Sequence, residues 1–315
     1  MKRIVVLVVA LCLLSGCWDA VSLSQAKYSL MVGVDFADGE WTVTALSLEP
    51  EAEEGETAQL HESTGPSLAR ALAGLYPHQS RRMLGMLQCA FFSQSAAGEG
   101  LEDFVDLMLR DAQVPLNFGV AVCTGAPREL LEGLQTAPQV WAVQEALRRP
   151  LGPARAQASF FDLVRDSATP GNAPLLPLVD GEAQLVGAAL FHGAALDTTF
   201  DEEKNKFLMM LRGAASNLQV VVPGGGGDLL AEVSLQRRME EGEIVLAGTA
   251  ALLHGPVEGA KGDIEKYLRG RCEGLLEELL EQGRGDALAV SGVTEAQVRV
   301  EVRMVERKEA SGGRK

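Results

Sequence analysis

The chain has 315 residues, of which 47% are hydrophobic, 23% are charged and 5% are aromatic. These values are ordinary for a globular protein and exclude a chain that is disordered throughout. The formal net charge is −15, and so acidic a surface repels phosphate backbones and anionic headgroups, which excludes nucleic acid as a partner. At about 100 to 200 residues per domain, the length predicts two or three domains.

The N-terminal segment has the organisation of a lipoprotein signal. A short basic stretch precedes the uncharged run 4–14, which is shorter than the ~20 apolar residues that a membrane-spanning helix needs. The sequence LSGC at residues 14–17 then looks like a bacterial lipobox. We therefore predict cleavage between Gly16 and Cys17, with S-diacylglycerol and an N-acyl chain on Cys17 as a stable anchor. The alternative is a plain signal peptide followed by a buried cysteine.

Three cysteines remain in the mature body, namely Cys89, Cys123 and Cys272. The first two lie in apolar, strand-like runs, where a free cysteine is usually a small buried hydrophobe. A disulfide between Cys89 and Cys123 on neighbouring strands is the alternative. The four histidines are scattered without ligand spacing, so we predict no metal and no cofactor apart from the covalent lipid on Cys17.

The first half of the mature chain predicts strands that alternate with helices. Residues 28–50 are expected to form a hairpin that turns at Asp38-Gly39. The acidic stretch 49–56 is expected to be a loop, and Pro66 is expected at the first position of a helix. The buried face of that helix would carry Leu68, Leu72 and Leu75.

A βαβ-like unit is predicted next, from a strand at 81–93, a helix at 99–111 and a strand at 117–125. Further helical segments are expected at 128–134, 139–148 and 155–166. The helix at 99–111 would turn four apolar residues inward and two aspartates toward water; these are Leu101, Phe104, Val105 and Met108, and Asp103 and Asp106.

The second half begins with a passage rich in Pro and Gly at 167–182, which predicts a domain boundary. A hairpin at 183–196 and a short helix within 202–214 follow. Three β-rich runs lie at 229–239, 243–253 and 296–306. Between the last two, the helix 264–282 carries an apolar stripe of Leu268, Cys272, Leu275, Leu276, Leu279 and Leu280, which would cover one face of an antiparallel sheet.

The predicted fold class is α+β, with two to three small domains, mixed and antiparallel sheets packed with helices, and a long amphipathic helix on the C-terminal sheet. The expected organisation is a signal peptide at 1–16, a lipidated tether at 17–27, an N-terminal α+β domain at 28–180, a C-terminal α+β domain at 181–308 with a candidate division near 215–228, and a loose tail at 309–315.

Short motifs with chemical associations are best explained by ordinary structure. Ser24 and Lys27 match S-x-x-K, but the partner motifs of penicillin-recognising enzymes do not follow. The glycine run 224–227 lacks the Gly-Lys-Ser/Thr of a phosphate loop and is expected to be a flexible loop. The letters Arg-Gly-Asp at 284–286 follow the last apolar turn of a helix and predict helix termination. We therefore expect that the protein is not an enzyme.

Four features along the chain together resemble the Ger(x)C family, the C-subunit lipoproteins of spore germinant receptors. They are a lipobox cysteine followed by Trp-Asp, a Gly-x-Asp in the first strand, a Leu-Arg-Asp that ends a helix, and a long helix followed by an aspartate-led strand. The positions that carry the resemblance, each of unknown role, are Trp18, Asp19, Gly33, Asp35, Arg110, Asp111 and Asp286.

The resemblance implies a palmitate-type lipoprotein of sporulating cells on the outer face of the spore inner, cytoplasmic membrane. It would act in nutrient-triggered germination beside a membrane-embedded A subunit and a permease-like B subunit, without a catalytic residue. Two other classes of protein are alternatives. A solute-binding lipoprotein of an ABC transporter would show two lobes around a cleft, and a lipid-anchored hydrolase would show a nucleophile within reach of a base.

Overall fold

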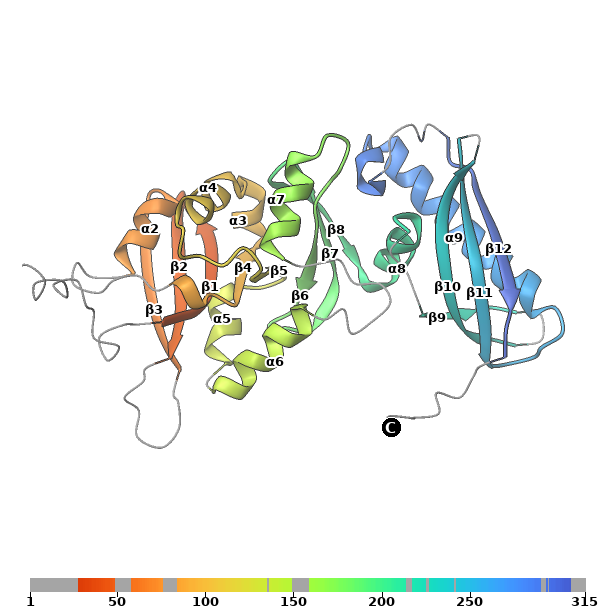
Figure 1. Cartoon of the computed structure of the whole chain (residues 1–315), viewed down its shortest axis with the longest axis horizontal. Helices are drawn as coiled ribbons and strands as arrows, with labels where there is room; N and C mark the ends of the chain where they lie inside the picture. The colour runs from red at the N-terminus through yellow and green to blue at the C-terminus, as the bar shows by residue number, and fades with distance from the viewer. Residues whose placement is uncertain are drawn as a thin grey trace, which may run out of the picture.

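The computed structural model describes residues 28–48, 58–75, 84–134, 136–148, 159–213, 217–224, 227–240, 242–289, 293 and 295–306. It contains two β-sheets with helices packed on them (Figure 1). The predicted lipidation site Cys17 and the neighbouring Trp18 and Asp19 lie outside the described residues. The α+β class expected from the sequence is confirmed.

The first sheet has eight strands in the order β3-β2-β1-β4-β5-β6-β7-β8. Its strands are β1 (Tyr28–Ala37), β2 (Glu40–Leu48), β3 (Ala58–Gly65), β4 (Cys89–Ser93), β5 (Gly119–Cys123), β6 (Leu175–Val179), β7 (Leu185–His192) and β8 (Ala195–Asp201). The predicted first hairpin is confirmed, because β1 and β2 pair in antiparallel fashion. Asp38 and Gly39 join them with φ of 53° and 80°, as a tight turn between right-twisted strands requires.

Parallel pairing defines the centre of this sheet. β1, β4, β5 and β6 run parallel, and the predicted βαβ unit is the connection from β4 to β5 through α3 (Gln94–Glu99) and α4 (Glu102–Arg110). All five residues of β4, of β5 and of β6 are buried, since helices cover both faces of the sheet. The inward and outward residues predicted for α4 are confirmed, with Val105 partly buried.

Helices cover this sheet on two sides. One apolar cluster holds residues of α2 (Leu68–Gly74), α3, α4 and α7 (Phe160–Ala168), and another holds residues of α5 (Pro127–Glu132) and α6 (Ala137–Arg148). The buried leucines predicted for α2 are confirmed. Its start is two residues later than expected, because the Ser67 side chain accepts the Arg70 N–H and so makes Ser67 the N-cap. Pro66 therefore precedes the cap.

The second sheet has four strands in the order β12-β11-β10-β9. They are β9 (Leu218–Val222), β10 (Leu229–Glu240), β11 (Glu243–His254) and β12 (Val298–Met304). The sheet was expected to be antiparallel, but β12 runs parallel to β11. The reason is the long helix α9 (Ala260–Glu281), which carries the chain from the end of β11 back toward its start.

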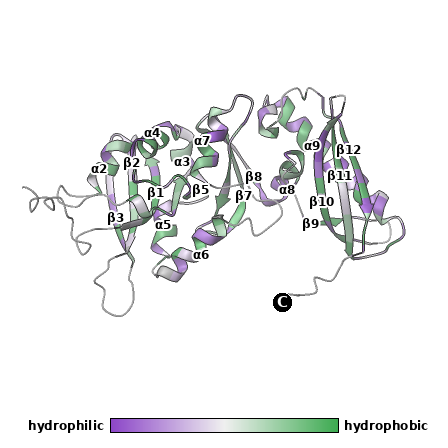
Figure 2. Cartoon of the chain, viewed as in Figure 1, coloured by the Kyte–Doolittle hydropathy of each residue, from purple (hydrophilic) through white to green (hydrophobic). Residues whose placement is uncertain are grey.

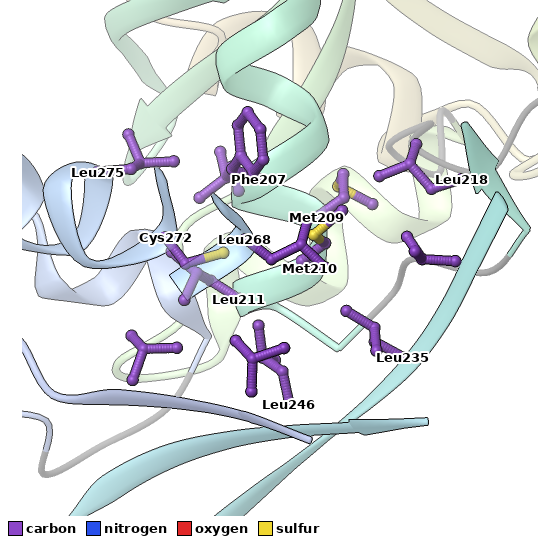
Figure 3. Packing of buried hydrophobic residues seen from close by; sticks show 14 of the residues in the cluster. Phe207, Met209, Met210, Leu211, Leu218, Leu235, Leu246, Leu268, Cys272 and Leu275 are labelled. Carbon is purple, nitrogen blue, oxygen red and sulfur yellow. The ribbon is translucent and has the colours of Figure 1, made fainter. Parts of the chain in front are cut away.

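α9 carries the predicted apolar stripe, with Leu280 only partly buried and the other five members buried. Together with α8 (Glu202–Leu211) it packs against the second sheet. Figure 3 shows Phe207, Met209 and Met210 of α8 among leucines from β9, β10, β11 and α9. Figure 2 shows that most helices carry hydrophobic residues on one face and hydrophilic residues on another.

One apolar cluster is shared by the two sheets. The cluster around α8 also includes Leu175, Leu190 and Phe200 from the first sheet. The first sheet continues across the predicted domain boundary between residues 180 and 181, where β6 pairs with β7. The proline-rich passage that suggested the boundary contains β6 itself.

The three described cysteines are buried and form no disulfide, as predicted. In the register of β4 and β5, Cys89 lies opposite Gly119 and Cys123 lies opposite Ser93. The two thiols are thus at opposite ends of their strands, and the alternative of a disulfide between them is wrong. Burial raises the pKa of Cys123 and of Cys272 to about 12, so both thiols are protonated near neutral pH.

Candidate functional site

Gly33 lies in the middle of β1, at a point where helix α5 approaches the strand closely. A Cβ atom at this position would lie 2.8 Å from Cβ of Pro127 and 3.2 Å from Cδ1 of Leu131. Real Cβ atoms are essentially never found so close to another carbon of a packed core. Gly33 is therefore needed for the contact of α5 with β1, which is a packing role.

Asp35 lies two residues further along β1 and joins this strand to the start of α3. Its Oδ1 accepts the Phe36 N–H at 2.8 Å and the Ser95 hydroxyl at 3.3 Å. Ser93 caps the same helix by accepting the Ala96 N–H at 3.0 Å. Because these oxygens are engaged with local donors, the group fixes the connection between β1, β4 and α3.

Arg110 and Asp111 mark the end of α4. Arg110 donates through Nε to Asp106 at 2.6 Å in an exposed pair one helical turn apart, and this pairing raises the pKa of Arg110. Asp111 accepts the Gln113 N–H at 3.0 Å, which turns the chain away from the helix toward β5. Both residues thus shape the exit from α4.

Asp286 lies between the two sheets. It was expected at the start of a strand, but it lies in the short helix η3 (Gly285–Leu288), and β12 begins only at Val298. Gly283, with a φ of 71°, ends α9, as predicted for helix termination in this region. The Asp286 Oδ2 atom is 3.5 Å from Nδ1 of His192, at the end of β7. Asp286, which follows the long helix of the second sheet, therefore contacts a residue of the first sheet.

Two partly buried arginines hold the same junction together. Arg212, at the C-terminal end of α8, donates through Nη1 to the carbonyl oxygens of Ala173 at 3.2 Å and Ala287 at 2.9 Å. Arg237 on β10 donates through Nη1 to the carbonyls of Leu211 at 2.9 Å and Leu288 at 2.7 Å. Together they connect the segment that leads into β6, the end of α8, β10 and η3.

Burial lowers the pKa of both guanidinium groups, but an arginine stays charged at any ordinary pH. The nearby carboxylates of Asp166 and Asp286 favour the charged guanidinium and so raise the pKa of Arg212, against the effect of burial. Asp166 is itself buried and accepts from Arg165 at 2.8 Å and from Asn172 at 3.2 Å. The charge of Arg212 is thus balanced in part by neighbouring acids.

Further ion pairs link β8 and α8 to α9 and the residues that follow it. Arg284 binds Asp197 of β8 through two nitrogens, with Nη2 3.0 Å from Oδ1. Lys204 of α8 contacts Glu278 of α9 at 2.9 Å, and Arg271 of α9 pairs with Glu203 of α8. We call the set formed by Arg212, Arg237, Asp166, Asp286, Asp197 and Arg284 the polar junction.

The polar junction is suited to holding two layers in a fixed arrangement. Ser167 lies near it, but its hydroxyl donates to the carbonyls of Leu163 at 2.8 Å and Gly193 at 3.3 Å, so it is engaged with backbone oxygens. Within the described ranges, no group of three or more His, Cys, Asp or Glu is placed to hold a metal ion. No helix among the described residues is long and apolar enough to cross a bilayer.

Two pockets lie outside the polar junction. One, of about 280 Å³, lies between α6 and the β6–β7 turn and is lined in part by Leu147, Pro177 and Leu185. The other, of about 170 Å³, lies between α8 and α9 beside Phe207 and Gly274. The side chains that line the first pocket carry no charge.

The predicted family positions do not form one site. Gly33 and Asp35 lie on β1, and Arg110 and Asp111 lie at the end of α4. Asp286 lies in the polar junction. Sequence reasoning missed the two arginines that dominate this junction. For Arg212 the available signal was an arginine directly after the apolar run FLMML at 207–211, since a cation at the end of a buried helix needs carbonyl partners.

Comparison with solved structures shows the fold class to which this arrangement of two sheets belongs. The structure is similar to the crystal structure of the GerBC protein, with a TM-score of 0.51 over 91% of this chain and 99% of that chain. Only 11% of the residues are identical, so the likeness is one of fold. Curated protein sequences give no match.

The family itself is shown by a sequence model. The model of the spore germination protein N-terminal domain matches residues 19–180, which is just over half of the chain. The chain therefore belongs to the Ger(x)C family of spore germination proteins. The match begins two residues after Cys17 and ends at the close of β6.

Proposed function

We propose that the protein is the lipid-anchored C subunit of a nutrient germinant receptor. The observation that carries this proposal is the family match over residues 19–180, which begins two residues after the lipobox cysteine. In this proposal Cys17 carries the lipid on the outer face of the spore inner membrane. The chain would assemble there with the membrane-embedded A and B subunits.

The described residues support a function through assembly rather than through chemistry. Asp35, Ser93 and Ser95 are engaged in joining β1 to α3, and the arginines of the polar junction bind backbone carbonyls. Such groups fix the positions of secondary structure elements. A receptor subunit that presents surfaces to its partners needs this rigidity and no catalytic group.

The anchor is tested with a matched pair of cysteine substitutions in spores that lack the native gene. Cys17→Ala removes the thiol that lipoprotein processing requires, whereas Cys12→Ala changes a cysteine of the signal and leaves the lipobox intact. We expect Cys17→Ala to abolish both the membrane-bound protein and nutrient-triggered germination. Cys12→Ala spores should germinate normally, and both strains should respond to an alkylamine that bypasses the receptor. Normal nutrient response of Cys17→Ala spores would overturn the proposal.

A second comparison separates assembly from chemistry. Leu279→Ala removes a buried side chain of α9 and should lower the levels of this protein and of the A subunit in spores. Ser24→Ala removes the serine of the S-x-x-K match and should leave germination unchanged. If Ser24→Ala spores with normal protein levels fail to germinate, an acylating serine takes part and the proposal of a function without chemistry is wrong.

A further inference from the structure

One edge of the first sheet is formed by the amino ends of its parallel strands. Backbone hydrogen bonds follow this edge from strand to strand. The Gln88 N–H donates to Leu30 at 2.7 Å, the Gly119 N–H donates to Gln88 at 2.7 Å, and the Phe160 N–H donates to Phe118 at 2.9 Å. The beginning of β1 is thereby connected to the start of α7, and we call this the amino edge.

Three large apolar side chains on the amino edge are exposed. Met86 is 43% exposed, Leu116 is 47% exposed and Phe161 is 53% exposed. Leu116 and Phe161 are neighbours, because the Phe161 N–H donates to the Leu116 carbonyl at 3.0 Å. The 3₁₀ turn η2 (Leu84–Met86) reaches the same loop, since a Cβ on Gly85 would lie 3.2 Å from the carbonyl oxygen of Gln113.

Single exposed apolar residues are ordinary on protein surfaces, whereas neighbouring ones indicate an interaction surface. The carboxylate closest in sequence to Phe161 does not oppose such a role. Asp162 accepts from the Ser159 hydroxyl and pairs with Arg165 at 2.8 Å. The charge beside the aromatic ring is thus compensated within α7.

The position of the lipid anchor decides which partner fits this surface. Ten residues, 18–27, separate Cys17 from Tyr28, and a fully extended chain of that length spans at most about 40 Å. Since β1 starts at the amino edge, a lipid on Cys17 brings this edge within reach of the bilayer. The net charge of −15 gives no attraction to anionic headgroups, so apolar contact is the favourable term that remains.

We propose that the amino edge is a second membrane contact, in which Met86, Leu116 and Phe161 enter the boundary between headgroups and acyl chains. The proposal rests on the lipidation of Cys17. The lipid would hold the protein on the membrane, and the three side chains would set its orientation there. This orientation leaves the opposite, carboxyl edge of the parallel strands turned away from the bilayer.

The test uses the lipidated full chain on phosphatidylcholine vesicles. Met86→Cys, Leu116→Cys and Phe161→Cys are each labelled with a polarity-sensitive maleimide. Labelling is selective, because the native thiols of Cys89, Cys123 and Cys272 are buried. The matched control is Met239→Cys near the end of β10, where the native methionine is 38% exposed. Quenching is measured with nitroxide-labelled acyl chains and with aqueous iodide.

The three edge labels should be quenched at least twofold more by the nitroxide lipid than the Met239→Cys label, which iodide should quench instead. Edge labels that behave like the control on protein that floats with the vesicles would overturn the proposal and leave the anchor intact. Protein that does not float with vesicles would show that the anchor is absent, and would overturn both.

Discussion

The strands β4, β5 and β6 of the first sheet are buried along their whole length, whereas β9, β10 and β12 of the second sheet alternate between buried and more accessible residues. The reason is the number of covered faces. Helices lie on both faces of the parallel centre, so every side chain there meets an apolar layer. The main helices of the second sheet contribute to a single apolar cluster. A continuous apolar run therefore indicates two covered faces, and an alternating one indicates a single covered face.

The comparison extends to how the regions are held together. The core of the first sheet is rich in aromatic rings, with Phe104 in edge-to-face contact with Phe92 at 4.8 Å between ring centroids. The core of the second sheet is mainly aliphatic. Where the two regions meet, both an apolar cluster and the polar junction hold them together. We therefore expect the molecule to unfold as one unit.

The largest effect is expected for Phe104→Ala in the first region. Phe104 is fully buried and also contacts Phe118 and Phe160, so the change leaves a cavity and should lower the free energy of unfolding by about 3–5 kcal/mol. Denaturant unfolding followed by circular dichroism measures it. A loss below about 1 kcal/mol would mean that the aromatic cluster is loosely packed.

Leu279→Ala is the corresponding change in the second region. The side chain is fully buried on α9, and its truncation should cost about 2–5 kcal/mol. Val257→Ala, at a position that is largely exposed, is the control and should cost little. If the two regions unfold together, Leu279→Ala shifts a single transition. Two separate transitions, with only one shifted, would show that the shared core does not couple the sheets.

Arg212→Met tests the polar junction between the regions. The carbonyls of Ala173 and Ala287 lose their charged donor, and leaving buried acceptors unsatisfied should cost about 1–3 kcal/mol. Hydrogen exchange should speed up in η3 and at the end of α8. Arg269→Met, at an exposed position on α9, serves as the control. Unchanged exchange in η3 would show that the apolar cluster alone fixes the two layers.

Gly33→Ala tests the close approach of α5 to β1. The added Cβ would meet Pro127 at 2.8 Å, and overpacking of this kind should cost about 1–3 kcal/mol. Gly98→Ala in α3 is the matched control, because nothing lies within 4 Å of its added Cβ and alanine favours a helix. Thermal melting compares the two variants. Equal melting temperatures would contradict the packing role of Gly33.

The smallest effect is expected for Arg110→Ala. Its ion pair with Asp106 is exposed on both sides, and such pairs contribute little to stability. The unfolding midpoint should stay at the wild-type value, with Arg128→Ala as a second exposed arginine for comparison. If nutrient-triggered germination nevertheless falls while stability is unchanged, Arg110 belongs to a partner surface rather than to the fold.

The sequence by itself determined the elements whose signals are local. The first hairpin follows from Asp38-Gly39, the βαβ unit follows from two apolar runs around an amphipathic helix, and α9 follows from its apolar stripe. The lipobox ending at Cys17 is equally local, and its lipidation stays a prediction. Local signals suffice in these cases because turn geometry and helical periodicity act over only a few residues.

Only the tertiary structure decided the rest. β6 was missed because Pro177 argues against a central strand, yet Pro177 pairs with Ala188 of β7, and the pairing of β6 with β5 begins only at Leu178. A missing N–H there breaks no bond to β5. The carbonyl partners of Arg212 lie 39 and 75 residues away along the chain. No local pattern can encode such contacts, because they exist only once the two sheets have come together.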